Sequence, residues 1–187
     1  MPRKKEYTEE EVIEKAMRLF WRNGFESTSM QMLEKEMGIN KFSIYSSFGN
    51  KQGVFTASLK CYKDKLDGIF KKFRESSNGV EDIKTFFYDS VEISNRPGNE
   101  KGCLVTSTYN ESHRLEDQTI KKDMQAFMEI LRNLFIQKLS MDKSKTEEEV
   151  LKQANFLLLA KHGLAAASRV NTAQEIEDYI ELTFRNI

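Results

Sequence analysis

Cysteine, proline and long apolar runs are all scarce in this chain of 187 residues. The two cysteines, Cys61 and Cys103, are far apart in the sequence, so we expect neither a disulfide framework nor a zinc site. The longest apolar run, residues 156–160, is too short to cross a bilayer, and the first residues are unlike a signal peptide. We therefore expect a protein of the reducing cytoplasm.

Groups that commonly carry catalysis or bind metals are also sparse. The only histidines, His113 and His162, do not belong to an E-x-x-H or H-x-x-x-H pattern, which leaves a di-iron or zinc site without support. The sequence has no glycine-rich phosphate loop and no evident pairing of a nucleophile with a base. We predict no metal site, no cofactor and no enzymatic activity.

A neutral formal charge hides an uneven distribution of charge along the chain. Residues 1–72 contain 14 Lys and Arg against 10 Asp and Glu, whereas residues 73–187 contain 15 against 19. Between residues 41 and 72, seven lysines stand against two acids, Asp64 and Asp67. Such a basic segment indicates either an anionic partner for this part alone or a solvated lysine face.

Helical periodicity runs through the whole sequence, without the alternating pattern of strands, so we predict an all-α fold. Thr8 and Thr28 are each followed three residues later by Glu or Gln, and these capping boxes predict the starts of the first two helices. The next predicted boundaries are Gly38, which ends the second helix, and Asn40 and Asn50, which cap the third and fourth.

Five further helices are predicted in the remainder of the chain, including two long ones at residues 118–139 and 146–168. The link between these two is short, so they should pack antiparallel. The Ser-Ser-Asn-Gly sequence at 76–79 is the clearest boundary. We predict an N-terminal three-helix bundle at 1–50, a connecting helix at 51–75 and a larger helical domain at 76–187.

The second and third helices, with a tight turn between them, match a helix-turn-helix at about residues 29–48. Ile39 and Ile44 are expected to face inward, and residues 38–51 contain no acid, which suits a surface that faces DNA phosphates. Tyr45 could instead cap the small core, and Lys41 could be an ordinary solvated lysine. The predicted DNA-binding residues are Thr28, Ser29, Lys41, Phe42, Ser43, Tyr45, Ser46 and Lys51.

Residues 12–62 resemble the tetracycline-repressor (TetR/AcrR) family of bacterial transcription regulators. The segments that carry the resemblance are AMRLFWRNGFESTSM, MGINKFSIYSSFGNK and QGVFTASL, and KGCLVTSTYNES resembles a segment found in one branch of the family. The sequence departs from the common pattern at Phe42, where a small residue is frequent, and at Ser46-Ser47, where a histidine often precedes the Phe. Because Phe42 could pack on a thymine methyl, the first departure concerns base preference.

The resemblance implies a homodimer that binds a double-stranded, palindromic operator and is most often a repressor. The domain at 76–187 would then bind a small-molecule effector and dimerise through the helices at 118–139 and 146–168. Effector binding would change the spacing of the two recognition helices and release the operator.

Aromatic residues and histidines of the larger domain could line an effector pocket, although core packing is the preferred interpretation for each aromatic residue taken singly. The candidates are Phe86, Tyr109, His113, Phe127 and His162. An interior rich in aromatic residues and Met favours an apolar or amphipathic effector. Cys103 could sense oxidants, but it has no basic neighbour at helical spacing, so a small buried thiol is the preferred interpretation.

Two other classes of function stay open from the sequence. The departures at Phe42 and Ser46-Ser47 allow a dimeric helical co-regulator or scaffold without DNA binding. A small all-α enzyme would need the catalytic groups that the sequence lacks.

Overall fold

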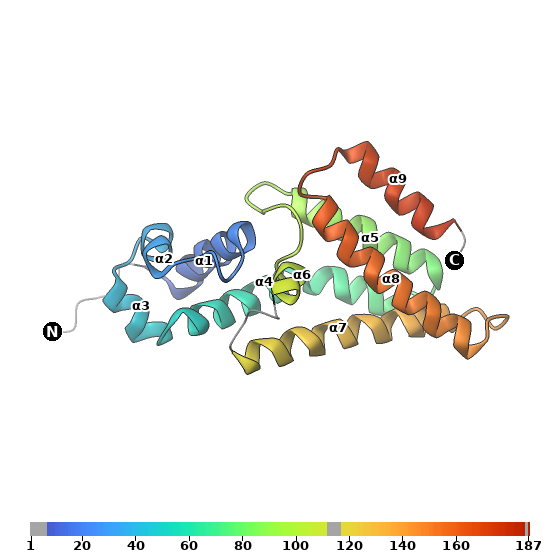
Figure 1. Cartoon of the computed structure of the whole chain (residues 1–187), viewed down its shortest axis with the longest axis horizontal. Coiled ribbons are helices and arrows are strands. Elements are labelled where there is room, and N and C mark those ends of the chain that lie inside the picture. Colours follow the sequence, from blue (N-terminus) through green and yellow to red (C-terminus); the bar gives the residue numbers. More distant parts are fainter. Residues whose placement is uncertain (1–6, 112–116, 186) are drawn as a thin grey trace.

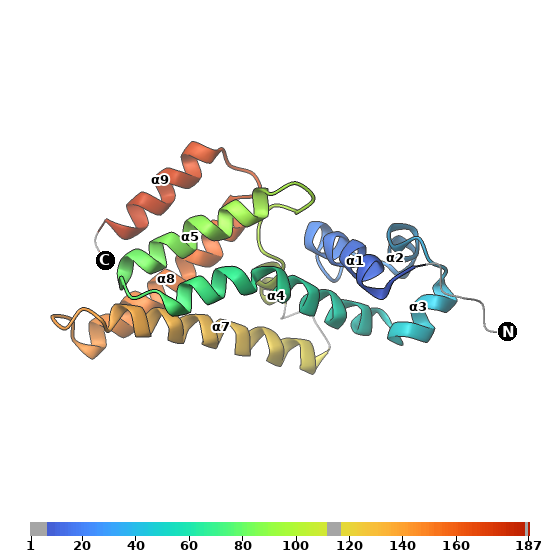
Figure 2. The same ribbon diagram turned by 180° about the vertical axis from the view of Figure 1, so that it is seen from behind.

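The computed structural model describes residues 7–111, 117–185 and 187, and these residues form nine helices and no strand, which confirms the all-α fold. The helices are α1 (Glu9–Asn23), α2 (Met30–Met37), α3 (Lys41–Phe48), α4 (Lys51–Glu75), α5 (Val80–Asn95), α6 (Leu104–Glu111), α7 (Gln118–Leu139), α8 (Glu147–Ala167) and α9 (Ala173–Phe184). Figures 1 and 2 show α1, α2 and α3 at one end of an elongated molecule, and α5, α7, α8 and α9 at the other. Among the described residues, no helix is long and apolar enough to cross a membrane.

Helix α4 is shared by the two ends of the molecule (Figure 1). Its first half packs along α1, where the ring centroids of Phe20 and Phe55 are 4.9 Å apart. Its second half packs on α5, where the centroids of Phe70 and Phe86 are 5.2 Å apart. A single helix therefore extends the one hydrophobic core from one end of the molecule to the other.

Most of the predicted helix boundaries are confirmed. Thr8 and Glu11 form a capping box at the start of α1. The side chains of Asn40 and Asn50 each accept a backbone N–H from three residues further on, at 2.8 Å, at the starts of α3 and α4. Gly38 ends α2 in the left-handed conformation, with φ 70°, which glycine adopts without steric cost.

The predicted cap of the second helix is wrong by one residue. Ser29 caps α2, because its hydroxyl oxygen accepts the N–H of Met32 at 3.2 Å. Thr28 is fully buried, and its hydroxyl donates to the carbonyl oxygen of Gly24 at 2.7 Å. Adjacent Ser and Thr both suit a cap, and here a carbonyl at the end of α1 takes the threonine hydroxyl.

The larger end is a bundle in which α5 packs against α4, α7 and α9. As predicted, α7 and α8 form an antiparallel pair, joined by residues 140–146 (Figure 1). Phe135 of α7 lies between two rings of α5, since its centroid is 6.2 Å from those of both Phe86 and Phe87. These buried aromatic contacts hold the long hairpin against α5.

Hydrogen bonds from α6 and from the end of α8 join the two ends of the molecule. The carboxylate of Glu111 accepts the backbone N–H of Phe25 at 3.1 Å, in the loop before α2. Arg169 donates to the carbonyl oxygen of Trp21 at 2.7 Å and to the hydroxyl of Ser107 at 3.1 Å. The larger end therefore helps to set the orientation of α1, α2 and α3.

A buried ion pair fixes the connection between α4 and α5. Lys138 lies 3.0 Å from Asp82, both side chains are buried, and Lys138 also donates to the carbonyl oxygen of Ser76. The backbone N–H of Asn78 donates to Asp82 at 2.8 Å. Burial acts to raise the pKa of Asp82, but the hydrogen bonds from Lys138 and Asn78 outweigh it, so that the pKa is lowered.

Asp82→Ala should lower the free energy of unfolding by about 3 kcal/mol, because it leaves Lys138 buried without a counter-ion. Adding Lys138→Met should recover much of this loss by removing the unpaired charge. Urea denaturation monitored by circular dichroism measures both. Asp67→Ala, which breaks an exposed ion pair with Arg74, is the control and should change stability by less than about 1 kcal/mol. Equal losses for Asp82→Ala and the control would contradict the prediction.

Candidate nucleic-acid surface and internal cavity

Helices α2 and α3 form the predicted helix-turn-helix, and buried side chains hold it against α1 and α4. Leu33 and Ile44 are completely buried, and Ile39 in the turn is buried as well, as predicted for both isoleucines. After α3, Gly53 lies so close to the carbonyl oxygen of Phe48 that a Cβ at this position would overlap it. The position of α3 is therefore set by packing on both sides.

The outward side of α3 carries five side chains, which we call the recognition face. They are Lys41, Phe42, Ser43, Tyr45 and Ser46. Phe42 is 81% exposed, an unusual position for a phenylalanine, and Tyr45 is 43% exposed. The ammonium group of Lys41 lies 5.7 Å from the centre of the Tyr45 ring. The five side chains lie on one short helix at the end of the molecule (Figure 1).

Two of the predicted DNA-binding side chains point elsewhere. Thr28 is buried, so its hydroxyl is not available at the surface, and that prediction is wrong for its side chain. The ammonium group of Lys51 lies 4.3 Å from the centre of the Phe25 ring and donates to the carbonyl oxygen of Glu26 at 3.4 Å. Burial lowers the pKa of Lys51. Lys51 would have to leave these contacts to reach a phosphate, whereas Ser29 lies at the start of α2 as predicted.

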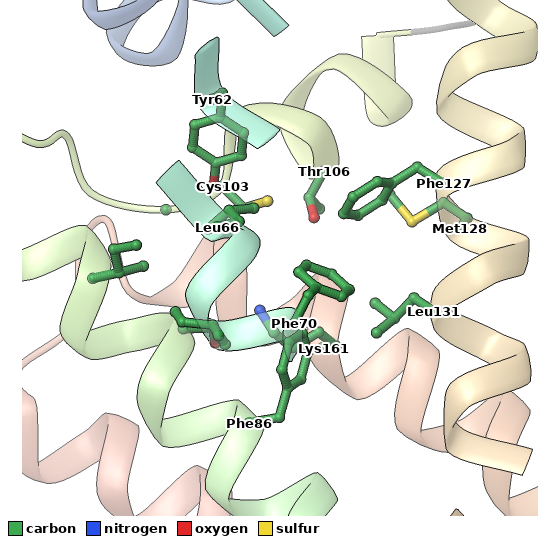
Figure 3. Close-up of a pocket in the computed structure, with 14 residues that line it drawn as sticks. Tyr62, Leu66, Phe70, Phe86, Cys103, Thr106, Phe127, Met128, Leu131 and Lys161 are labelled. Carbon is green, nitrogen blue, oxygen red and sulfur yellow. The ribbon is translucent and has the colours of Figure 1, made fainter. Parts of the chain in front are cut away.

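An internal cavity lies between α4, α5, α6, α7 and α8 (Figure 3). Its volume is about 30 Å³, or about 490 Å³ when the crevices between side chains and the open mouth are included. The volume of about 30 Å³ is the space that a molecule could occupy, and it would hold about two water molecules. The lining residues are Tyr62, Leu66, Ile69, Phe70, Phe86, Ser90, Ile93, Gly102, Cys103, Thr106, Phe127, Met128, Leu131 and Lys161.

Of the predicted effector-binding residues, Phe86 and Phe127 line this cavity. Tyr109 and His162 do not; they pack on each other, with ring centroids 5.5 Å apart, and Nε2 of His162 lies 3.1 Å from Sδ of Met128. Burial, together with the charge of Lys161, lowers the pKa of His162. The prediction for His113 falls outside the described residues.

Sequence reasoning missed most of the lining, including Tyr62, Phe70 and Lys161. The aromatic residues of α4 follow the period of an ordinary buried face, so the pattern gave no sign of a cavity. Lys161 did leave a signal, because it stands four residues after Leu157 and three before Leu164, within an otherwise apolar stripe. A lysine in the middle of such a stripe is rarely buried without a reason.

Cys103 is half-buried and lines the same cavity as Lys161. The sequence suggested no basic neighbour because Lys161 comes from another helix. In the described part of the chain, no cluster of His, Cys, Asp or Glu side chains is suited to holding a metal ion.

Residues 12–57 match the family model described as bacterial regulatory proteins, tetR family. The chain is 38% identical to the HTH-type transcriptional repressor ComR of Escherichia coli (strain K12), over 64% of this chain and 65% of ComR. It is 28% identical to the HTH-type transcriptional regulator YezE of Bacillus subtilis (strain 168), over 58% of this chain and 56% of YezE. The chain thus covers less than two thirds of the length of either relative. Both relatives are transcription regulators rather than enzymes, in agreement with the prediction of no enzymatic activity.

A solved structure of CifR, a TetR family transcriptional regulator, is similar to this chain over its whole length. The CifR chain is a cysteine mutant complexed with 26-bp double-strand operator DNA, and it matches with a TM-score of 0.83 and 18% identity over 98% of both chains. At this identity the likeness shows the fold, in which an N-terminal helix-turn-helix domain precedes a larger helical domain.

Phe42→Ala should change the free energy of unfolding by less than about 0.5 kcal/mol, because the ring packs against little of the protein. Ile44→Ala, two residues away on the buried side of α3, should cost about 2–5 kcal/mol. Urea denaturation of both variants measures the difference. A cost for Phe42→Ala close to that for Ile44→Ala would show that Phe42 belongs to the core.

Proposed function

We propose that the chain, whose residues 12–57 match the tetR family of bacterial regulatory proteins, is a ligand-responsive, DNA-binding transcription regulator. In this proposal a small-molecule effector releases it, as a repressor, from a palindromic operator in the cytoplasm. The observation that carries the proposal is the recognition face, whose basic, hydroxyl and aromatic side chains project from a firmly anchored α3. In the same proposal, residues 1–50 form the DNA-binding domain and residues 51–75 form the connecting helix. Residues 76–187 form the domain that binds the effector and dimerises.

The recognition face offers both kinds of contact that a specific operator complex needs. Lys41 and the hydroxyl of Tyr45 can bind phosphates, which position a protein on the duplex. Phe42 stands furthest out and can pack on a thymine methyl in the major groove, which distinguishes bases. Ser29 lies where the free N–H groups at the start of α2 can receive a phosphate.

Helices α7 and α8 form the proposed dimer interface. They expose three large apolar side chains, Ile130, Phe156 and Leu159, which would be covered by the same pair of helices from a second copy. Such a four-helix interface would hold two recognition helices about 34–36 Å apart, the repeat of one DNA turn.

The cavity is the proposed effector site. Effectors usually occupy pockets of about 300–1,000 Å³, so this cavity must widen to admit one. Widening would move α4 relative to α7, and α4 carries α1 and the helix-turn-helix with it. The effector would thereby favour an arrangement in which the recognition helices no longer match the operator.

Selection from a random pool of duplexes should enrich a palindromic site, and affinity for it should fall steeply as salt rises. Lys41→Ala should weaken binding to all duplexes and lower the salt slope by about one. Phe42→Gly should instead relax the preference at a single base pair, by about 1 kcal/mol. Lys143→Ala, at an exposed lysine in the loop between α7 and α8, is the matched control and should change neither the affinity nor the base preference.

If the affinity for DNA did not change with salt concentration, and did not change in the double variant Lys41→Ala, Tyr45→Phe, the recognition face would be excluded as the DNA contact. The protein would then be a helical co-regulator or scaffold without DNA binding.

Leu159→Glu should convert the dimer into a monomer, because it buries a charge in an apolar interface. Leu182→Glu on α9 is the control: Leu182 is similarly exposed, at 56% against 69% for Leu159, but lies outside the proposed interface. Sedimentation velocity measures the mass of both variants. A dimeric Leu159→Glu variant, or a monomeric Leu182→Glu variant, would place the interface elsewhere.

A further inference from the structure

Lys161 is a buried lysine that faces the cavity and has no partner for its charge. It is 7% exposed, and among the described residues no hydrogen bond or ion pair involves its ammonium group. Figure 3 shows its nitrogen pointing into the cavity beside Phe70. None of the described residues that line the cavity carries a carboxylate. Burial lowers the pKa of Lys161, as expected for an ammonium group removed from water.

Lys138, a second buried lysine among the described residues, shows how this protein pairs a buried charge that has a structural role. Lys138 is 5% exposed, and it has Asp82 at 3.0 Å and the carbonyl oxygen of Ser76 as partners. Lys161 shares its cavity with Cys103 and faces the rings of Phe86 and Phe87, with ring centres 5.9 and 6.0 Å from its nitrogen. Contacts at that distance offset little of the cost of removing an ammonium group from water.

We propose that the effector is an amphipathic monocarboxylate, whose carboxylate binds Lys161 and whose apolar part lies against Phe70, Phe86 and Phe127. This inference rests on the proposed function only in taking the cavity as the effector site. A carboxylate would supply the charge that Lys161 lacks and accept hydrogen bonds from its ammonium group. The three aromatic rings would cover the apolar part.

The charge and the size of the head group follow from the same surroundings. The described lining residues supply one ammonium group, so a dianion such as a phosphate monoester would bury a second, unpaired charge. An uncharged head group would leave Lys161 without a partner. A single, compact negative charge fits the small cavity with the least widening.

This placement also explains how such a ligand would act on the rest of the protein. Lys161 belongs to α8, whereas Phe70 belongs to α4 and Phe127 to α7. A molecule held by its head on α8 would push its apolar part between α4 and α7, whose rings at Phe70 and Phe127 are 5.5 Å apart. The widening that operator release requires would therefore come from the apolar part of the ligand.

Isothermal titration calorimetry of the protein without DNA tests the inference, with the phenylalkanoates from phenylacetate to 6-phenylhexanoate and their primary amides as probes. At least one carboxylate should bind the wild-type protein roughly tenfold or more tightly than its amide, the usual range for a charged hydrogen bond. Lys161→Met should abolish that preference. Lys143→Met, the same substitution at an exposed lysine in the loop between α7 and α8, should keep it.

Equal binding of acids and amides, or no binding across the series, would overturn the inference, and so would a preference that persists in Lys161→Met. The comparison of acid with amide in the wild-type protein holds even if Lys161→Met does not fold. DNA binding by the protein without ligand is measured separately, so a failure of the proposed function would be recognised as such.

Discussion

The structure depends on α4 being one continuous helix. It has 25 residues, which corresponds to about 37 Å, and it is long enough to reach from the helix-turn-helix to the cavity. No proline interrupts it, and aromatic side chains bury its two halves at opposite ends of one hydrophobic core. Because a helix bends much less readily than a loop, a small tilt at Phe70 becomes a larger displacement at α3.

A second connection between the two ends, made by hydrogen bonds, would determine the direction in which such a tilt of α4 moves α1, α2 and α3. Arg169, which follows α8, bonds the carbonyl oxygen at Trp21, and Glu111 of α6 bonds the amide of Phe25. Lys161 is eight residues before Arg169 and belongs to α8 itself. A ligand that binds Lys161 while displacing α4 would therefore act on both connections at once. Helices α1, α2 and α3 would tilt together with α4, while the hydrogen bonds of Arg169 and Glu111 restrain them at Trp21 and Phe25.

The fold could be predicted from the sequence to within a few residues because local signals determine it: capping side chains, glycines and apolar periodicity. The errors arose where two neighbours offer the same chemistry, as with Thr28 and Ser29, since only the tertiary position of Gly24 decides between them. The cavity could not be predicted, because a void is a property of how five helices pack. Periodicity indicated that Phe86 and Phe127 lie on the inward sides of their helices, but it did not indicate that Tyr109 faces His162 instead of the cavity.

The acid-free stretch at residues 38–51 also has a different meaning in three dimensions. Glu34 of α2 reaches the start of α3 and accepts the backbone N–H of Lys41 at 2.9 Å, while Asn40 takes the N–H of Ser43. The amino end of α3 is thus occupied by the protein's own acceptors and is a poor place for a phosphate. In the proposed complex, phosphates would be bound by the side chains of Lys41 and Tyr45 and by the N–H groups that the caps Ser29 and Asn50 leave free at the starts of α2 and α4. With its end closed in this way, α3 would meet the duplex in the proposed complex through the recognition face, on which Phe42 is 81% exposed.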